Sequence, residues 1–288
     1  MNTLRIEHKT VYRYRQPVSL GPHHLLLRPR ESRDLRLLAS EIVMAPTAAA
    51  TTWAEDVFGN AVAVATFEGM TDSLTIESKV ELELVGQAWP VFPVAASAIS
   101  YPFLYADDEW TDLGALAMQQ HEDPNGRLRT WTRGFVRSDP TDTLALLKDL
   151  SASILGWISY QSRDDEGTQT PLQTLDRGWG SCRDLAVLFA EAARCLGFGA
   201  RLVSGYLFNS SESITGSSGP GSTHAWTEVY VPGAGWITFD PTNRSVGGFN
   251  LIPVAVARDI KQVMPIAGSF VGMTDAFGGM SVEIRVTA

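Results

Sequence analysis

The chain has 288 residues, of which 44% are hydrophobic and 19% are charged, a composition typical of a globular protein with one large domain or two modest ones. Its formal net charge of -9 argues against nucleic acid as a partner, because phosphate backbones bind to basic surfaces. Two cysteines are too few to build a disulfide framework or a zinc ribbon.

The start of the chain does not resemble a secretory leader, because Arg5, Glu7, His8 and Lys9 interrupt it. No apolar run approaches the length needed to cross a bilayer. We therefore expect a cytoplasmic protein without a membrane partner. The sequence does not indicate its oligomeric state.

Residues 1–90 predict an antiparallel β domain with a sandwich-like arrangement. Apolar and polar residues alternate from Leu74 to Leu84, as expected for a strand with one face in solvent. Gly59 and Asn60 tolerate a positive φ and mark a turn between two strands. Several short strands separated by such turns are typical of a β-sandwich.

Residues 91–288 predict a second, mixed domain. A proline- and aromatic-rich connector covers residues 86–106, and helical patterns follow from Asp107 to about Tyr160. Residues 139–142 have the sequence Asp-Pro-Thr-Asp, which predicts the start of a helix. The apolar residues of this helix recur at helical spacing: Leu144, Leu147, Leu150, Ile154 and Ile158.

The stretch Gly-Trp-Gly-Ser-Cys-Arg-Asp at residues 178–184 predicts a tight loop that leads into a helix. Ser181 and Asp184 have the spacing of a capping box, so Cys182 is expected to begin the helix and Gly197 to end it. A thiol at this end lies in the positive field of the helix dipole, which favours the thiolate. The position suits a nucleophile, although a cysteine there is more often a small buried apolar residue.

Strands are predicted after this helix. Residues 200–208 form one strand, and residues 209–223 form a serine- and glycine-rich loop that is either a mobile lid ahead of His224 or a surface insertion. Residues 223–231 and 236–240 predict two further strands joined by a Pro-Gly-Ala-Gly turn.

His224 and Asp240 are expected on one face of these two strands, because side chains alternate along a strand. If Tyr230 pairs with Trp236, the histidine and the aspartate become diagonal neighbours within reach of a hydrogen bond. A register shift by one residue would place them on opposite faces. A thiol nucleophile needs a histidine base that such an acid orients.

Each of these residues also has a purely structural interpretation. His224 fits an ordinary strand histidine, and Asp240 fits a turn residue ahead of proline. Trp179 and Trp226 are either core aromatics or contacts for the substrate. Cys195 lies mid-helix among core positions and is expected to have no catalytic role.

The motifs at these positions resemble the transglutaminase-like superfamily, in its bacterial branch with an N-terminal β domain, whose members are often named cysteine proteases. The core motifs are residues 178–184, 200–206, 224–233 and 235–243, and the similar flanking segments are residues 12–14, 27–30, 56–60 and 254–259. The resemblance therefore covers nearly the whole chain.

This resemblance implies an α+β fold, in which an N-terminal antiparallel β domain precedes a papain-like, transglutaminase-like core with a helical lobe and an antiparallel sheet. It also implies a Cys-His-Asp triad, which is carried over to Cys182, His224 and Asp240. No cofactor is expected. A zinc site made of the same three residues would lack a close pair of ligands.

Two reactions and one non-catalytic function fit this pattern. An acyl-enzyme on Cys182 is released by water in a protease or peptidase and by an amine in a transglutaminase. We expect hydrolysis of an amide or isopeptide bond in a peptide or protein substrate, because water is the default acceptor. A binding module on the same fold is the third alternative. The backbone N–H of Cys182 is expected to stabilise the oxyanion, and Gln173, Tyr160 and Trp179 are candidates for the second donor.

Overall fold

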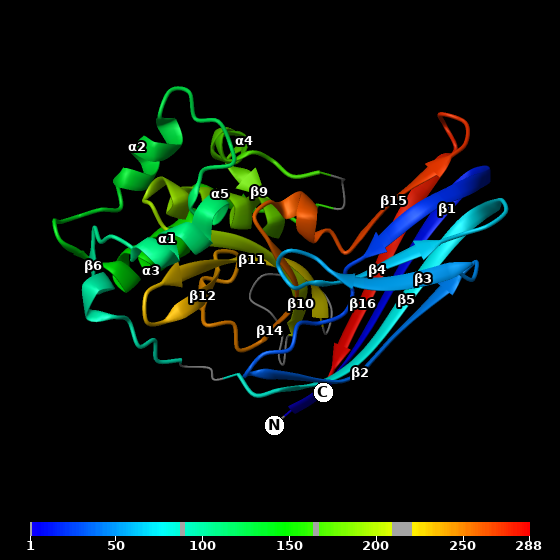
Figure 1. Cartoon of the computed structure of the whole chain (residues 1–288). Coiled ribbons are helices and arrows are strands. Elements are labelled where there is room, and N and C mark those ends of the chain that lie inside the picture. Colours follow the sequence, from blue (N-terminus) through cyan, green and yellow to red (C-terminus); the bar gives the residue numbers. More distant parts are fainter. Residues whose placement is uncertain (1, 87–89, 164–166, 209–220) are drawn as a thin grey trace.

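The computed structural model describes residues 2–86, 90–163, 167–208 and 221–288. An antiparallel sheet projects from a mixed core in which helices and a second sheet pack together (Figure 1). This is the α+β fold that the sequence predicts, with strands first, then a helical lobe, then the strands of the core.

The first sheet is organised around one long strand, β1 (Asn2–Leu25). Antiparallel neighbours line both edges of β1. The remaining strands of this sheet are β2 (Leu35–Ala45), β3 (Ala50–Glu55), β4 (Ala61–Thr66), β5 (Thr71–Leu84), β15 (Ile266–Val271) and β16 (Phe277–Thr287). An apolar cluster that includes Val18, Ala63 and Leu74 connects the strands along the second half of β1.

Both ends of the chain build this sheet. The last two strands, β15 and β16, follow the core in sequence but pair with β1, so they lie beside the N-terminal strands in Figure 1. The chain thus leaves the first sheet, forms the core and returns. The predicted division of the chain at residue 90 stays a prediction.

The helical lobe follows the first sheet. Its α-helices are α1 (Asp107–Leu113), α2 (Arg127–Arg133), α3 (Thr143–Trp157), α4 (Pro171–Arg177) and α5 (Cys182–Cys195). Its 3-10 turns and short strands are η1 (Ala96–Ala98), η2 (Gly114–Ala117), β6 (Ser100–Tyr101), β7 (Thr141–Asp142), β8 (Ser159–Tyr160) and β9 (Trp179–Gly180).

Two helix starts illustrate how the sequence sets these boundaries. The carboxylate of Asp142 accepts a hydrogen bond from the N–H of Ala145 at 2.7 Å, so α3 begins where the Asp-Pro-Thr-Asp pattern predicts. Helix α4 was not predicted from the sequence. Its signal was present, because Thr170 and Gln173 form a capping box around Pro171, which stands at a first-turn position that favours proline.

The core sheet has the strand order β13-β12-β11-β10-β14. Its strands are β10 (Ala200–Phe208), β11 (Gly221–Val231), β12 (Gly235–Asp240), β13 (Ser245–Val246) and β14 (Leu251–Ala257), and the 3-10 turn η3 (Ile260–Val263) follows. Tyr230 pairs with Trp236, which confirms the predicted register. Helix α5 packs on one face, where the Thr227 hydroxyl donates a hydrogen bond to the Ala186 carbonyl at 2.8 Å.

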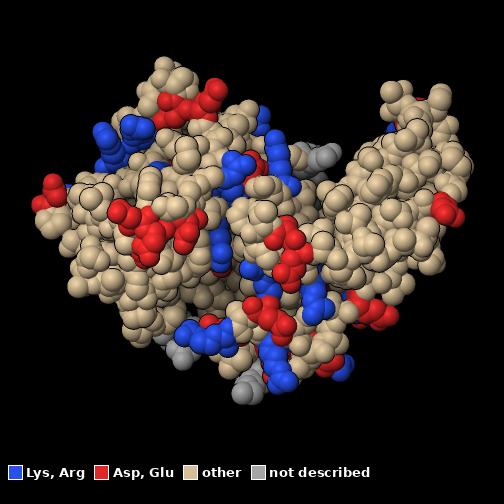
Figure 2. All heavy atoms as spheres, in the orientation of Figure 1, with Lys and Arg blue, Asp and Glu red and all other residues tan. Residues whose placement is uncertain are grey.

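Charged side chains of both signs are interspersed over the face that Figure 2 shows, and the projecting sheet carries few of them there. None of the helices in the described part of the chain is long and apolar enough to span a membrane.

Candidate active site

Cys182 is the first residue of α5, with Ser181 at the N-cap. The Asp184 carboxylate accepts hydrogen bonds from the backbone N–H of Ser181 at 2.8 Å and from its hydroxyl at 2.9 Å. The helix ends at Cys195, two residues before Gly197, whose φ is 89°. Both predicted ends of this helix are confirmed.

Asp184 has a larger role than the predicted cap. Its carboxylate is fully buried and forms an ion pair with Arg163 at 3.1 Å. It also accepts a hydrogen bond from the N–H of Gln169 at 2.6 Å. A Cβ atom at Gly180 would come within 2.9 Å of the Asp184 Cβ, so only glycine fits there. These contacts hold the loop that presents Cys182.

His224, near the start of β11, meets Asp240, the last residue of β12. The Nε2 atom of His224 lies 2.8 Å from Oδ2 of Asp240, and the two residues are 6% and 0% exposed. Asp240 also accepts hydrogen bonds from the N–H of Thr242 at 3.0 Å and from the side-chain amide of Asn243 at 2.6 Å. Asn243 was not singled out from the sequence, although it ends the Asp-Pro-Thr-Asn motif.

The imidazole of His224 also forms a hydrogen bond with the thiol of Cys182. Because Nε2 is engaged by Asp240, the nitrogen available to the thiol is Nδ1. The backbone N–H of Ala225 donates a further hydrogen bond to the same sulfur. Cys182 is partly exposed. The structure thus brings the three predicted residues together in the order thiol, imidazole, carboxylate.

The electrostatics of this trio favour a charged pair. Burial alone would raise the pKa of Cys182, but the hydrogen bond and charge of His224, with smaller effects of Ala225 and Arg183, lower it. Burial alone would lower the pKa of His224, yet Asp240 and Cys182 raise it to about 10. The pKa of the Asp240 carboxyl is lowered because His224 outweighs the cost of burial. Thiolate and imidazolium therefore stabilise each other.

Tyr160 lies next to this trio. Strand β8 pairs with β9, which places Tyr160 beside Gly180. Burial, followed by the negative charges of Cys182 and Asp240, raises the pKa of its phenol, so the hydroxyl stays protonated at neutral pH. The side-chain carbonyl of Gln173 accepts a hydrogen bond from the N–H of Thr170 at 2.9 Å, within the capping box of α4. Trp179 is partly buried, with the Arg177 guanidinium 5.7 Å from its ring.

Trp226 is too deeply buried to contact a substrate. Its side chain is 1% exposed and stacks on the imidazole of His224 with the ring centres 6.1 Å apart. The expectation that Trp226 contacts substrate does not fit this burial, because the ring is enclosed by the core. The corresponding expectation for Trp179 stays a prediction.

Cys195 lies at the other end of α5. Its sulfur accepts a hydrogen bond from the side-chain amide of Gln119 at 2.9 Å. Burial, with the nearby charges of Glu191 and Asp123, raises the pKa of this thiol to about 11. It is therefore far less reactive than Cys182 at neutral pH.

Two further expectations concern the surroundings of the site. Most of the loop predicted as a lid, residues 209–220, lies outside the described residues. Within the described ranges, no group of three or more His, Cys, Asp or Glu side chains is arranged to hold a metal ion.

Known proteins are similar to this chain in sequence and in fold. Residues 4–83 match the bacterial transglutaminase-like N-terminal region, and residues 129–241 match the transglutaminase-like superfamily. An uncharacterized protein of Mycobacterium leprae is 24% identical over 93% of each chain, and one of Mycobacterium tuberculosis is 27% identical over 92% of this chain and 86% of its own. A solved structure from Cytophaga hutchinsonii, described as a "putative cysteine protease", has a TM-score of 0.71 at 17% identity and covers 100% of this chain and 92% of its own.

Proposed function

We propose that this chain, which belongs to the transglutaminase-like superfamily in its bacterial branch, is a thiol-dependent acyl-transfer enzyme that cleaves an amide or isopeptide bond through Cys182, His224 and Asp240. One observation carries the proposal. The buried imidazole of His224 is hydrogen-bonded both to the Asp240 carboxylate and to a thiol at the start of a helix.

The reaction begins with the thiolate of Cys182. Its sulfur attacks the carbonyl carbon of the substrate, forms a C–S bond and moves an electron pair onto the carbonyl oxygen. When this intermediate collapses, the C=O double bond re-forms and the C–N bond breaks. The His224 imidazolium gives its proton to the leaving nitrogen, and Asp240 keeps the ring in place. A thioester remains on Cys182.

Water completes the reaction in the same site. The now neutral imidazole of His224 takes a proton from the attacking water, whose oxygen bonds to the thioester carbon. Collapse of this second intermediate breaks the C–S bond, releases a carboxylic acid and returns the thiolate. The imidazolium is then restored beside Asp240.

The oxyanion of each intermediate needs hydrogen-bond donors. The N–H of Cys182 is in the first turn of α5, where backbone N–H groups have no partner within the helix. We favour the Tyr160 hydroxyl as the second donor. The charge of Cys182 contributes to the raised pKa of this phenol, which indicates that the two side chains lie near each other. One such donor typically contributes about 2.7–4 kcal/mol to catalysis.

The acceptor distinguishes the candidate reactions. We favour hydrolysis, and therefore a cysteine protease or peptidase acting on a peptide or protein in the cytoplasm, because water is the default acceptor and needs no dedicated binding site. Transfer to an amine, as in a transglutaminase, is the alternative. A non-catalytic binding module would have no use for the lowered pKa of the Cys182 thiol.

A peptide library that contains glutamine and isopeptide bonds tests this proposal. The protein is incubated with the library and a primary amine, and the products are identified by mass spectrometry. Hydrolysed products that are absent with the Cys182→Ala variant support a peptidase, and amine adducts support a transglutaminase. Equal product formation by the variant would contradict both.

A further inference from the structure

A turn of the N-terminal region packs on the core sheet near Trp226, two residues from His224 in β11. Side chains alternate along β11, so Ala225 and Val229 face α5 while Trp226 faces the other way. There Trp226 forms an apolar cluster with side chains of β10 and β14: Val203, Leu207, Leu251 and Val256. Phe58, from the turn between β3 and β4, packs against this cluster and also against the larger cluster that contains α5.

The turn at residues 56–60 holds its own shape. The Asp56 carboxylate accepts hydrogen bonds from the N–H groups of Phe58 and Asn60, both at 2.9 Å, and from the Asn60 amide at 2.8 Å. Gly59 has a φ of 69°, a conformation that favours glycine. Phe58 is therefore presented from a well-ordered turn rather than from a free loop.

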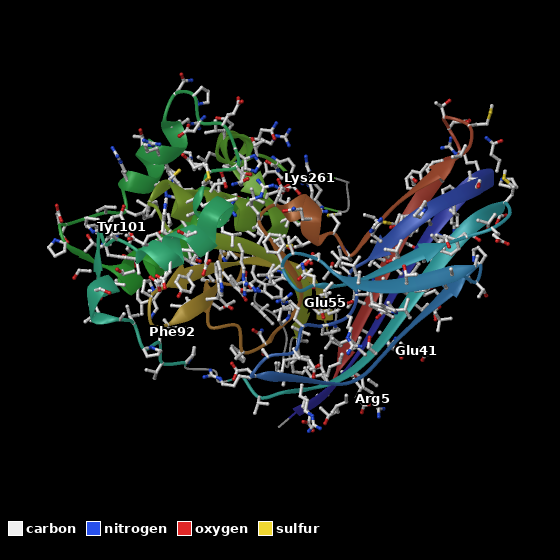
Figure 3. All side chains as sticks on the ribbon, in the orientation of Figure 1. Arg5, Glu41, Glu55, Phe92, Tyr101 and Lys261 are labelled. Carbon is white, nitrogen blue, oxygen red and sulfur yellow. The ribbon has the colours of Figure 1, made fainter. Side chains whose placement is uncertain are left out.

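Asn60 attaches this turn to the core. It is fully buried, and its amide donates to the Val256 carbonyl at 2.7 Å while its carbonyl accepts from the Val256 N–H at 2.9 Å. The Arg30 guanidinium donates to the Asn60 side chain at 2.6 Å and to the Phe58 carbonyl at 3.1 Å. Since β14 is the last strand of the core sheet, the turn occupies its open edge. Glu55, which precedes the turn, is labelled in Figure 3 where the first sheet meets the core.

Trp226 connects this contact with the triad. Its ring stacks on the His224 imidazole at 6.1 Å with an angle of 28° between the planes. Gly205 of β10 is the strand partner of His224. A Cβ atom added at Gly205 would lie 2.8 Å from the Trp226 ring and 2.0 Å from the Ile252 carbonyl oxygen, so the Trp226 ring is tightly packed against β10. The position of the imidazole therefore depends on how the Trp226 cluster is packed.

We propose that the turn at residues 56–60 is a positioning element of the active site, in which Phe58 supports the Trp226 cluster and thereby holds His224 in line with Cys182 and Asp240. This inference rests on the proposed function. It assigns the N-terminal region an indirect part in the reaction, which acts through Trp226 and His224.

Alkylation of Cys182 by iodoacetamide as a function of pH tests this inference in the full-length protein without a substrate. Phe58→Ala should raise the apparent pKa of the thiol and slow alkylation at about pH 6 by about tenfold, because a tilted imidazole stabilises the thiolate less. Phe58→Leu should restore part of the loss. The other groups that face the thiol and imidazole, Asp240, Arg183 and Tyr160, are unchanged in these variants.

Phe67→Ala is the matched control, since Phe67 is a partly buried phenylalanine of the same region that packs on the other apolar cluster, around Val18. Equal shifts in the Phe58 and Phe67 variants, or no shift in either Phe58 variant, would overturn the inference. If Phe58→Ala does not fold, the Phe58→Leu titration decides. If Cys182 of the unsubstituted protein had the ordinary pKa of a free thiol, this result would instead contradict the proposed function itself.

Discussion

The Nε2 atom of His224 lies 2.8 Å from the Oδ2 atom of Asp240, although the two residues are 16 positions apart in the chain. Burial removes both groups from water, where their charges would be screened. The negative carboxylate keeps the imidazole protonated and leaves its Nδ1 atom for Cys182. Through His224, this relationship lowers the pKa of the Cys182 thiol.

Replacing Asp240 should weaken the thiolate. In Asp240→Ala the imidazole loses both its charge partner and its orientation, so we expect alkylation of Cys182 at about pH 6 to slow by about 100-fold. Asp240→Asn retains an acceptor without the charge and should give an intermediate rate. If both variants react as fast as the unsubstituted protein, the carboxylate has no influence on the thiol.

The two cysteines should differ in reactivity. The pKa of Cys182 is lowered by His224, whereas burial raises that of Cys195 to about 11, so brief treatment with iodoacetamide near neutral pH should modify Cys182 alone. Peptide mapping by mass spectrometry identifies the modified residue. Comparable modification of both cysteines in the folded protein would contradict this expectation.

The buried ion pair on α5 should contribute strongly to stability. Glu191 and Arg194 are each 1% exposed, and Glu191 also accepts hydrogen bonds from the N–H groups of Gln120 and His121. Glu191→Ala should lower the free energy of unfolding by about 3–5 kcal/mol, because it leaves a buried guanidinium without its partner. Urea denaturation measures this change. The control is Asp149→Ala, which removes an exposed pair with Arg137 and should cost at most about 1 kcal/mol; similar losses would argue against the prediction.

Stability should fall as His8 becomes protonated. His8 is 3% exposed between the first sheet and the core, where it forms a hydrogen bond with Tyr206 at 2.9 Å. Burial lowers its pKa from 6.5 to about 4. The unfolded chain binds this proton more readily than the folded protein does. The contribution of neutral His8 to the free energy of unfolding is therefore complete above pH 6.5 and is lost as the pH falls towards 4.

This loss amounts to at most about 3 kcal/mol. Urea denaturation at several pH values, compared with His8→Gln, isolates the contribution of this group. The variant should lose less stability on acidification than the unsubstituted protein. An identical decrease in both proteins would show that other groups are responsible.

The sequence predicted those parts of the fold that local patterns determine. The boundaries of α5, the start of α3 and the pairing of Tyr230 with Trp236 followed from capping residues and strand alternation. The same alternation predicted that His224 and Asp240 would share a face. Their catalytic roles remain predictions, because geometry and relatedness support them without measuring a reaction.

Other features depend on contacts between distant segments. No local pattern indicates that β16 pairs with β1, or that Asn60 binds the backbone of Val256 across 196 positions. The burial of Trp226 was also not evident, because an aromatic residue beside a histidine fits both a groove and a core. The helix α4 is different, since its capping residues were visible in the sequence and were overlooked.

The pH dependence of Cys182 alkylation tests the central claim most directly, since it reports the thiolate–imidazolium pair without any knowledge of the substrate. In the unsubstituted protein the rate should already be high well below the ordinary thiol pKa of about 8.5, and it should lose this low-pH reactivity in His224→Ala. A titration centred on the ordinary value, unaffected by removal of His224, would contradict a catalytic role for Cys182.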